Sequence, residues 1–326
     1  MNSFAFLAYP RDVAQDLGRF AHFPSLKRFP EAVYEYALRK TSAGPAVIGQ
    51  LTSAQHDLQG HVISLPLTPH QLRTLPVQLI RERVQEAIHC ARDLGATVIG
   101  LGALTSERPE VGHALRRNRD ISITGGGAYR TATVVLEIER LLKHLPKNPT
   151  VTLIGSDEVR LAMLSPVLEN IHGIHGLHVT PHPEPARLRE ADLLVLLGDL
   201  PGVQIRSEHL RYNAIVLNAA RSKVLEPRVL RERSDVILTD FSTFNPTIRL
   251  QGGPIHTHTL CPSLTETILL AQEGHQGHFA LDVPTQQQLE YILLLLKKHP
   301  HQQFEFVSAQ HRPARSTQVQ RPNLWI

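Results

Sequence analysis

Three short segments of the sequence carry residue types that could do chemistry. The first is a turn that starts at Gly155, directly after an apolar run, and leads into a predicted helix. Between a buried strand and a helix, such a turn can hold phosphate through backbone amides and the positive end of the helix dipole. We therefore predict a cofactor-binding turn, in which Gly155, Ser156 and Arg160 could contact the anion.

Two features of this turn oppose phosphate binding. Turns that bind dinucleotides carry three glycines, which allow a tight bend, close approach of the diphosphate and close helix packing. Here only Gly155 remains, and Glu158 and Leu161 take the other two positions. Repulsion between an acid and a phosphate costs about 1 to 4 kcal/mol for each close pair. The sequence thus predicts weak dinucleotide binding at this turn.

The second segment is Cys261-Pro262, which stands directly before a predicted helix. The helix dipole lowers the pKa of a thiol at this position and favours the thiolate, which is the nucleophilic form. His256 and His258 precede it and could act as the base or orient a carbonyl group. The alternative is a small, packed cysteine that follows two solvated loop histidines.

The third segment is the run of glycines at residues 125–127, which ends a short strand and opens a helix. Successive amides at a helix start attract an anion or a carbonyl oxygen. The loop after the short strand at 97–102 offers the hydroxyls of Thr105 and Ser106. They could contact a ligand, or they could cap the helix that follows. Five residues are thereby predicted to bind substrate: Thr105, Ser106, Gly126, Gly127 and Arg130. The alternative for the glycines is a flexible strand-to-helix turn.

The elements that position these segments alternate between strand and helix. In the first half, strands at 47–51 and 61–65 resemble a hairpin, and 77–94 is an amphipathic helix that ends at Gly95. After a Pro-rich linker, the sequence predicts a strand at 151–155, a helix at 158–170 and a strand at 177–180. Three further buried strands follow at 191–198, 214–218 and 235–239. Continuous apolar strands of this kind indicate a parallel sheet with both faces covered.

The predicted fold class is therefore α/β. An N-terminal α/β substrate domain precedes a Rossmann-like, doubly wound parallel-sheet domain, and C-terminal helices return to the first domain. The predicted limits are 1–146 for the first domain, 147–258 for the second, 259–308 for the helices and 309–326 for a loose basic tail.

Composition limits the class of protein further. A length of 326 residues suggests two domains, and 42% hydrophobic with 20% charged residues is typical of a globular protein. A net charge of +4 is too small and too scattered to predict nucleic-acid binding. The longest apolar run stops at Lys297, so no transmembrane segment and a cytoplasmic location are expected. Two cysteines and 19 scattered histidines predict no disulfide framework and no metal site.

Several motifs resemble those of one family. Residues 100–106 (GLGALTS) are similar to a Gly-Gly-Phe-Thr-Ser loop, and residues 127–132 (GAYRTA) are similar to a Thr-Thr-Gly-Asn-x-x-Thr-Ala helix start. Residues 265–270 (TETILL) are similar to an Ala-Glu-Ala-Met-Leu-Leu helix. In this order and spacing, the chain resembles the long-chain acyl-acyl-carrier-protein reductases, which form fatty aldehydes.

This resemblance implies a reduction in two steps. A cysteine thiolate takes the acyl group from its carrier as a thioester, and NADPH in the second domain reduces it to the aldehyde. The acyl chain would lie in an apolar cavity of the first domain, and the partner would be acyl carrier protein or acyl-CoA. Counted back from Glu266, the family's cysteine position falls on Ser263, two residues after Cys261. The catalytic candidates are thus Cys261, Ser263 and His258.

The sequence leaves three hypotheses open. The first is an NADPH-dependent reductase of acyl thioesters. The second is a non-catalytic relative that binds an acyl group or another small ligand and has a regulatory role. The third is a dehydrogenase similar to shikimate dehydrogenase or glutamyl-tRNA reductase, because those chains also place a substrate domain before a Rossmann domain.

Overall fold

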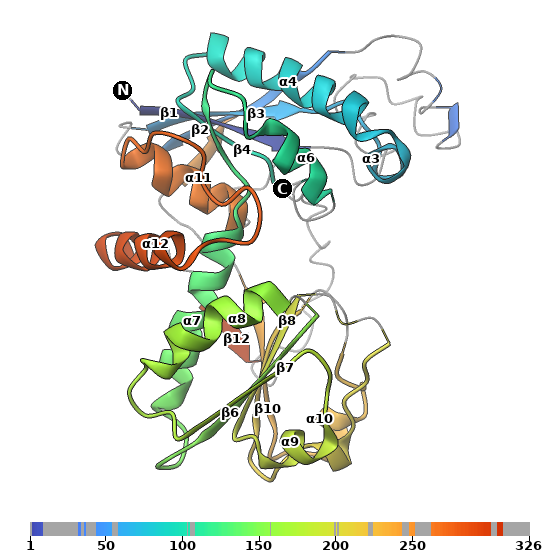
Figure 1. Ribbon diagram of the computed structural model, residues 1–326, viewed down its shortest axis with the longest axis vertical. Helices are drawn as coiled ribbons and strands as arrows, with labels where there is room; N and C mark the ends of the chain where they lie inside the picture. The colour runs from blue at the N-terminus through green and yellow to red at the C-terminus, as the bar shows by residue number, and fades with distance from the viewer. Residues whose placement is uncertain are drawn as a thin grey trace.

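The structure is a computed structural model with two lobes, each built on a six-stranded sheet (Figure 1). It describes residues 2–8, 32–33, 36, 44–53, 58–102, 104, 108–156, 158–198, 200, 202–220, 224–242, 248–251, 262–300 and 305–308. Both sheets are mostly parallel and carry helices, so the predicted α/β class is confirmed.

The upper lobe of Figure 1 contains the first sheet, with strand order β11-β2-β3-β1-β4-β5. Its strands are β1 (Asn2–Ala8), β2 (Ala46–Ser53), β3 (Leu58–Ser64), β4 (Val98–Gly100), β5 (Ser122–Thr124) and β11 (Ile248–Gln251). β1 runs parallel to β3 and β4, and β2 pairs antiparallel with β3. The predicted hairpin is therefore present.

The first lobe includes the helices α3 (Pro69–Thr74), α4 (Val77–Asp93) and α6 (Pro109–Leu115). Thr68 caps α3, because its hydroxyl accepts a hydrogen bond from the Gln71 amide at 3.0 Å. α4 buries one apolar face against the sheet and ends before Gly95, whose φ of +80° suits a glycine. The predicted helix and its glycine stop are confirmed.

The second sheet has the strand order β12-β10-β9-β8-β6-β7. Its strands are β6 (Thr150–Gly155), β7 (Gly176–Thr180), β8 (Leu193–Gly198), β9 (Ile215–Ala220), β10 (Ile237–Ser242) and β12 (Glu305–Ser308). Its short helical elements are α9 (Pro185–Glu190), η2 (Ser207–His209) and α10 (Val229–Glu232), and α8 (Glu158–Glu169) follows β6. All pairs except β10–β12 are parallel, and the strand order reverses between β6 and β8. Doubly wound sheets bind ligands at such a reversal, outside the carboxyl ends of the strands.

One long helix, α7 (Gly127–Leu142), connects the two lobes (Figure 1). α11 (Pro262–Gln272) packs on β1, β4 and α7, and α12 (Gln286–Lys298) packs on α7 and α8. A single hydrophobic cluster includes Phe4 of the first sheet, Ile138 of α7, Leu153 of the second sheet and Ile292 of α12. The two lobes therefore share one continuous core, and α11 returns to the first lobe as predicted.

Two short strands lie in a different sheet from the one that their predicted domain implies. β11 falls within the range 147–258 but pairs with β2 of the first sheet. β12 falls within the range 259–308 but pairs with β10 of the second sheet. Both are edge strands of four residues whose partners lie far away in the sequence, so no local pattern could reveal the pairing. Within the described ranges, no helix is long and apolar enough to cross a bilayer.

Candidate functional site

The carboxyl ends of strands from both sheets meet the start of α7. Thr124 ends β5, and α7 begins three residues later. The first turns of α7 line a small cavity together with Gly198 at the end of β8 and Ala219 in β9. This crevice, where α7 meets the second sheet, is lined by two of the residues that the sequence predicts to be functional, Arg130 and Arg160.

The predicted cofactor turn is shaped mainly by packing. A Cβ atom on Gly155 would lie 3.2 Å from the Cβ atom of Leu197 and 3.3 Å from a side-chain methyl of Leu161. Leu161 is itself buried, so its side chain fills the space beneath the turn. Glu158 is exposed in the first turn of α8, where a phosphate would approach. The tight packing therefore favours glycine at position 155, and the acid at position 158 opposes an anion.

The cavity beside this turn is small. Its volume is about 10 Å³, enough for one water molecule. The residues that line it come from α7, α8 and the ends of β8 and β9: Arg130, Thr131, Val134, Arg160, Leu164, Leu197, Gly198 and Ala219. Two residues that the sequence assigns to different ligands, Arg130 for substrate and Arg160 for cofactor, thus line the same cavity.

The glycine run before α7 holds a carboxylate that belongs to the protein. Glu266 of α11 is completely buried, and its carboxylate accepts hydrogen bonds from the amides of Gly126 at 3.0 Å and Tyr129 at 2.6 Å. The hydroxyl of Thr124 also donates to this carboxylate. The amide of Gly126, which the sequence predicts to bind substrate, therefore donates to a carboxyl group of the protein itself.

Burial controls the ionisation of Glu266. Removal from water raises the pKa of the carboxyl group to about 7, against the lowering effect of the hydrogen bonds from Thr124, Tyr129 and Gly126. Sequence reasoning used this glutamate only to count back to the nucleophile position. The signal that could have identified it is one acid within an otherwise apolar helical run, because a buried acid requires donors.

Ser263 lies beside the same helix start. It is buried in the first turn of α11, with 5% of its surface exposed. Gly126 has a φ of +82°, and a Cβ atom there would overlap the Cβ and Cα atoms of Ser263. The starts of α7 and α11 therefore touch because position 126 has no side chain. The remaining candidates Cys261, His256, His258, Thr105 and Ser106 lie outside the described residues.

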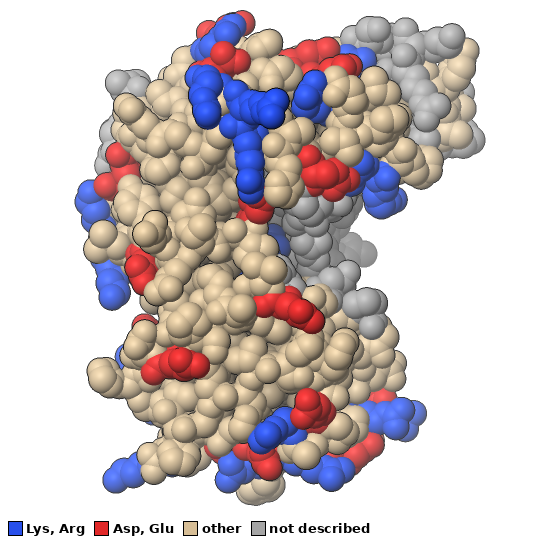
Figure 2. Space-filling model, in the orientation of Figure 1, with Lys and Arg blue, Asp and Glu red and all other residues tan. Residues whose placement is uncertain are grey.

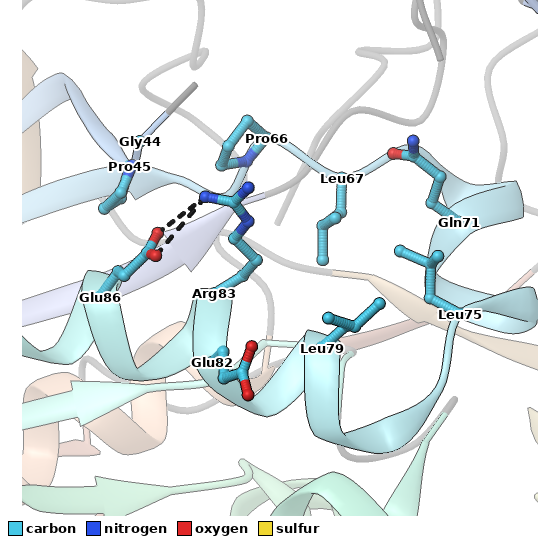
Figure 3. A pocket seen from close by; sticks show the side chains of 10 residues that line it. All are labelled: Gly44, Pro45, Pro66, Leu67, Gln71, Leu75, Leu79, Glu82, Arg83 and Glu86. Atoms are coloured by element: carbon cyan, nitrogen blue, oxygen red, sulfur yellow. Dashed lines mark hydrogen bonds and ion pairs between the residues drawn. The ribbon is translucent and has the colours of Figure 1, made fainter. Parts of the chain in front are cut away.

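A larger hollow, which we call the first-lobe groove, lies between α4 and the segment before α3. Its volume is about 900 Å³, within the range typical of small-molecule sites. Figure 3 shows Leu67, Leu75 and Leu79 towards one end, and Arg83 paired with Glu86 at 3.1 Å towards the other. The groove is thus apolar at one end and charged at the other.

Among the described residues, no group of three or more His, Cys, Asp or Glu side chains is placed to hold a metal ion. Cys90 is half-buried in α4, and burial raises the pKa of its thiol, which disfavours the nucleophilic thiolate.

Comparison with solved structures finds distant similarity to nicotinamide-dependent enzymes. Methylenetetrahydrofolate dehydrogenase-cyclohydrolase of Trypanosoma brucei, solved with NADP, is 15% identical, with 92% of this chain and 86% of that chain covered and a TM-score of 0.35. The bifunctional enzyme of the same type from Thermoplasma acidophilum is 10% identical, with coverages of 91% and 89% and a TM-score of 0.32. NAD-dependent formate dehydrogenase of Staphylococcus aureus is 11% identical, with coverages of 92% and 95% and a TM-score of 0.28.

At these identities and TM-scores, the similarity assigns neither an activity nor a substrate to this chain. No protein-family model matches the chain, and neither does any curated protein.

The contact between α7 and α11 predicts a large effect of Gly126→Ala. The left-handed φ costs about 1–2 kcal/mol for alanine, and overlap with Ser263 adds about 1–3 kcal/mol. We expect the free energy of unfolding in urea to fall by about 2–5 kcal/mol. Gly95→Ala is the control, because Gly95 has a φ of +80° and open space around it. Equal losses in the two variants would contradict the close contact.

The buried Glu266 predicts a pH-dependent stability. Its pKa is about 7 in the folded protein and near the ordinary 4.5 in the unfolded chain, so the folded state binds more protons between these values. The free energy of unfolding should therefore decrease as pH rises from 4.5 to 7, by up to about 3 kcal/mol. Glu266→Gln cannot ionise, so this part of the slope should disappear in the variant. Parallel pH curves for the two proteins would refute the assignment.

Proposed function

We propose that this protein binds the acyl chain of a long-chain acyl thioester in its first-lobe groove. In this proposal, it is a relative of the long-chain acyl-acyl-carrier-protein reductases that does not reduce its ligand by the conventional NADPH route. The observation that carries the proposal is a difference in cavity volume. The first-lobe groove has a volume of about 900 Å³, whereas the cavity beside the cofactor turn has a volume of about 10 Å³.

The chemistry of the groove suits an amphipathic ligand. Leu67, Leu75 and Leu79 offer apolar surface, and Leu79 remains 47% exposed although it is a large apolar side chain. A ligand that covers such a leucine removes apolar surface from water. Burial of a full side chain contributes about 1.5–3 kcal/mol to the free energy of binding. The charged pair of Arg83 and Glu86 at the other end suits the polar head of a ligand rather than its chain.

The second lobe supports the non-catalytic form of the proposal. Reduction requires a nicotinamide cofactor, whose diphosphate would approach the start of α8. Glu158 stands there, and the buried side chain of Leu161 occupies the position at which a glycine allows close helix packing. Both features act against the dinucleotide, one by charge and the other by volume.

The nucleophile position supports the same form. Ser263 stands where the resemblance places the cysteine, and a serine hydroxyl needs an adjacent base before it can attack. The nearest acid along the helix, Glu266, already accepts hydrogen bonds at the start of α7. The reductase hypothesis therefore depends on Cys261 as the nucleophile.

A basic surface on the first lobe would suit an acidic carrier protein. Figure 2 shows Lys and Arg side chains gathered on the upper lobe, over the region of α4 and α6. The segment between α6 and β5 contributes three exposed arginines: Arg116, Arg117 and Arg119. Arg116 pairs with Asp282, whereas the loop position of Arg117 and Arg119 makes them accessible to an acidic partner.

The groove predicts that Leu79→Asp weakens acyl binding. A carboxylate among apolar contacts replaces a favourable contact with an unfavourable one, so we expect the Kd for palmitoyl-CoA to rise about 10- to 100-fold. Calorimetric titration measures it. The control is Leu294→Asp, because Leu294 of α12 is also an exposed helical leucine, at 62%, and does not line the groove.

The same preparation tests whether the protein is a reductase. With palmitoyl-CoA and NADPH together, we expect no NADPH oxidation above the rate without protein and no acyl adduct by mass spectrometry. NADPH oxidation matched by aldehyde, with an adduct lost in Cys261→Ala, would establish the reductase hypothesis. Equal acyl binding by Leu79→Asp and the wild type would exclude the groove as the site.

The basic surface predicts a difference between the two carriers. Arg117→Glu with Arg119→Glu should weaken binding of palmitoyl-acyl carrier protein several-fold at low salt, because the reversed charges repel an acidic partner. Binding of palmitoyl-CoA should stay within twofold of the wild type. Arg228→Glu with Arg231→Glu, two exposed positions of the second lobe, is the matched control. Equal effects of the two double variants would contradict docking at this surface.

A further inference from the structure

A further hollow, which we call the helical groove, lies among α7, α8 and α12. Its volume is about 600 Å³, within the range of binding sites in proteins. α12 packs on both α7 and α8 where the two lobes join (Figure 1). The helical groove shares no lining residue with the first-lobe groove or with the cavity beside the cofactor turn. Five apolar side chains line it: Val135, Leu142, Val167, Ile171 and Leu293.

The apolar wall of the helical groove is the outer edge of the core that the two lobes share. Val135 belongs to that core, and the other four side chains pack against it while they remain partly exposed. Apolar side chains that gather around a hollow, with polar residues beside them, mark a site of association. A protein surface that covered the helical groove would extend the shared core outwards.

Two opposite charges border this apolar wall. Glu139 of α7 and Lys143, directly after α7, both line the groove, lie one helical turn apart and are exposed. Neither side chain forms an ion pair or a hydrogen bond with another described residue. By contrast, Glu137 and Arg140 of the same helix pair with each other. The charges at positions 139 and 143 are therefore available to a partner.

We propose that the helical groove is the interface of a homodimer in which the α7 helices of two copies pack against each other in antiparallel directions. The two-fold axis passes between positions 139 and 143. Glu139 of each copy then faces Lys143 of the other copy. The apolar side chains of the two grooves meet beside these ion pairs, and each copy covers the exposed edge of the other's core.

A second copy of the chain is the partner that the charges fit. A two-fold interface brings the same patch of both subunits together, so every residue contact occurs twice. One acid and one base, four positions apart on an antiparallel helix pair, thus form two ion pairs without any other protein. A groove for a strongly acidic or strongly basic partner would instead carry charges of one sign.

Charge exchange tests the proposal in the full chain, with sedimentation velocity measured over a range of protein concentrations. We expect a monomer–dimer equilibrium for the wild type. Glu139→Lys and Lys143→Glu each replace two attractions with two repulsions, so the dissociation constant of the dimer should rise at least about tenfold in each. The double variant that carries both changes restores opposite charges across the axis. Its dissociation constant should return to within about threefold of the wild-type value.

Leu293→Gln tests the apolar wall in the same assay. The variant brings a polar group into the interface, so we expect the dissociation constant to rise about tenfold. Leu230→Gln is the matched control, because Leu230 of α10 is also partly exposed and does not line the groove. Glu208→Lys, at an exposed acid of the second lobe, is the control for the charge variants. Both controls should dimerise as the wild type does, and urea unfolding verifies that each variant folds.

Three outcomes would overturn the proposal. The first is a wild type that remains monomeric at every concentration. The second is that the folded single charge variants associate as tightly as the wild type, or that the double variant fails to recover the association that they lose. The third is growth beyond the dimer, because a two-fold interface closes on itself. None of these measurements contains an acyl ligand, so failure of the dimer is distinguishable from failure of acyl binding.

Discussion

The carboxylate of Glu266 at the start of α7 is the interaction on which the arrangement of the molecule depends. It joins α11 to Thr124 of β5 and to the first amides of α7, and α7 then continues into the core shared by both sheets. A buried acid is costly unless its oxygens are satisfied, and a helix start offers donors with no intrahelical partner. The donors at the helix start thus offset part of the cost of burying the acid, and the acid accepts from amides that have no intrahelical partner. This contact joins the start of α7 to α11.

This internal ion has a consequence for ligands. The helix start at Gly126 would be the natural place for an external anion, but Glu266 occupies its amides. The start of α8 is the other natural place, and Glu158 stands there. Both helix starts that face the crevice therefore carry acids.

The sequence predicts the elements well and the site only in part. Strands such as 151–155 and the helix that ends at Gly95 follow from local periodicity and caps, which depend on nearby residues. The pairing of β11 with β2 and the convergence of Arg130 with Arg160 depend on residues far apart in the chain. Glu266 combines both cases, because its burial follows from an apolar helix but its donors are some 140 positions away.

The turn at Gly155 illustrates how a motif residue can remain for a reason other than its usual one. A side chain there would make tight contacts of 3.2 Å with Leu197 and 3.3 Å with Leu161, so packing alone favours glycine at this bend. Leucine at position 161 buries apolar surface, a gain of about 1.5–3 kcal/mol that a glycine would forgo. The second lobe is therefore more stable with leucine at position 161 than with the glycine of the dinucleotide-binding fingerprint. Stability and close approach of a cofactor thus favour different residues at this position.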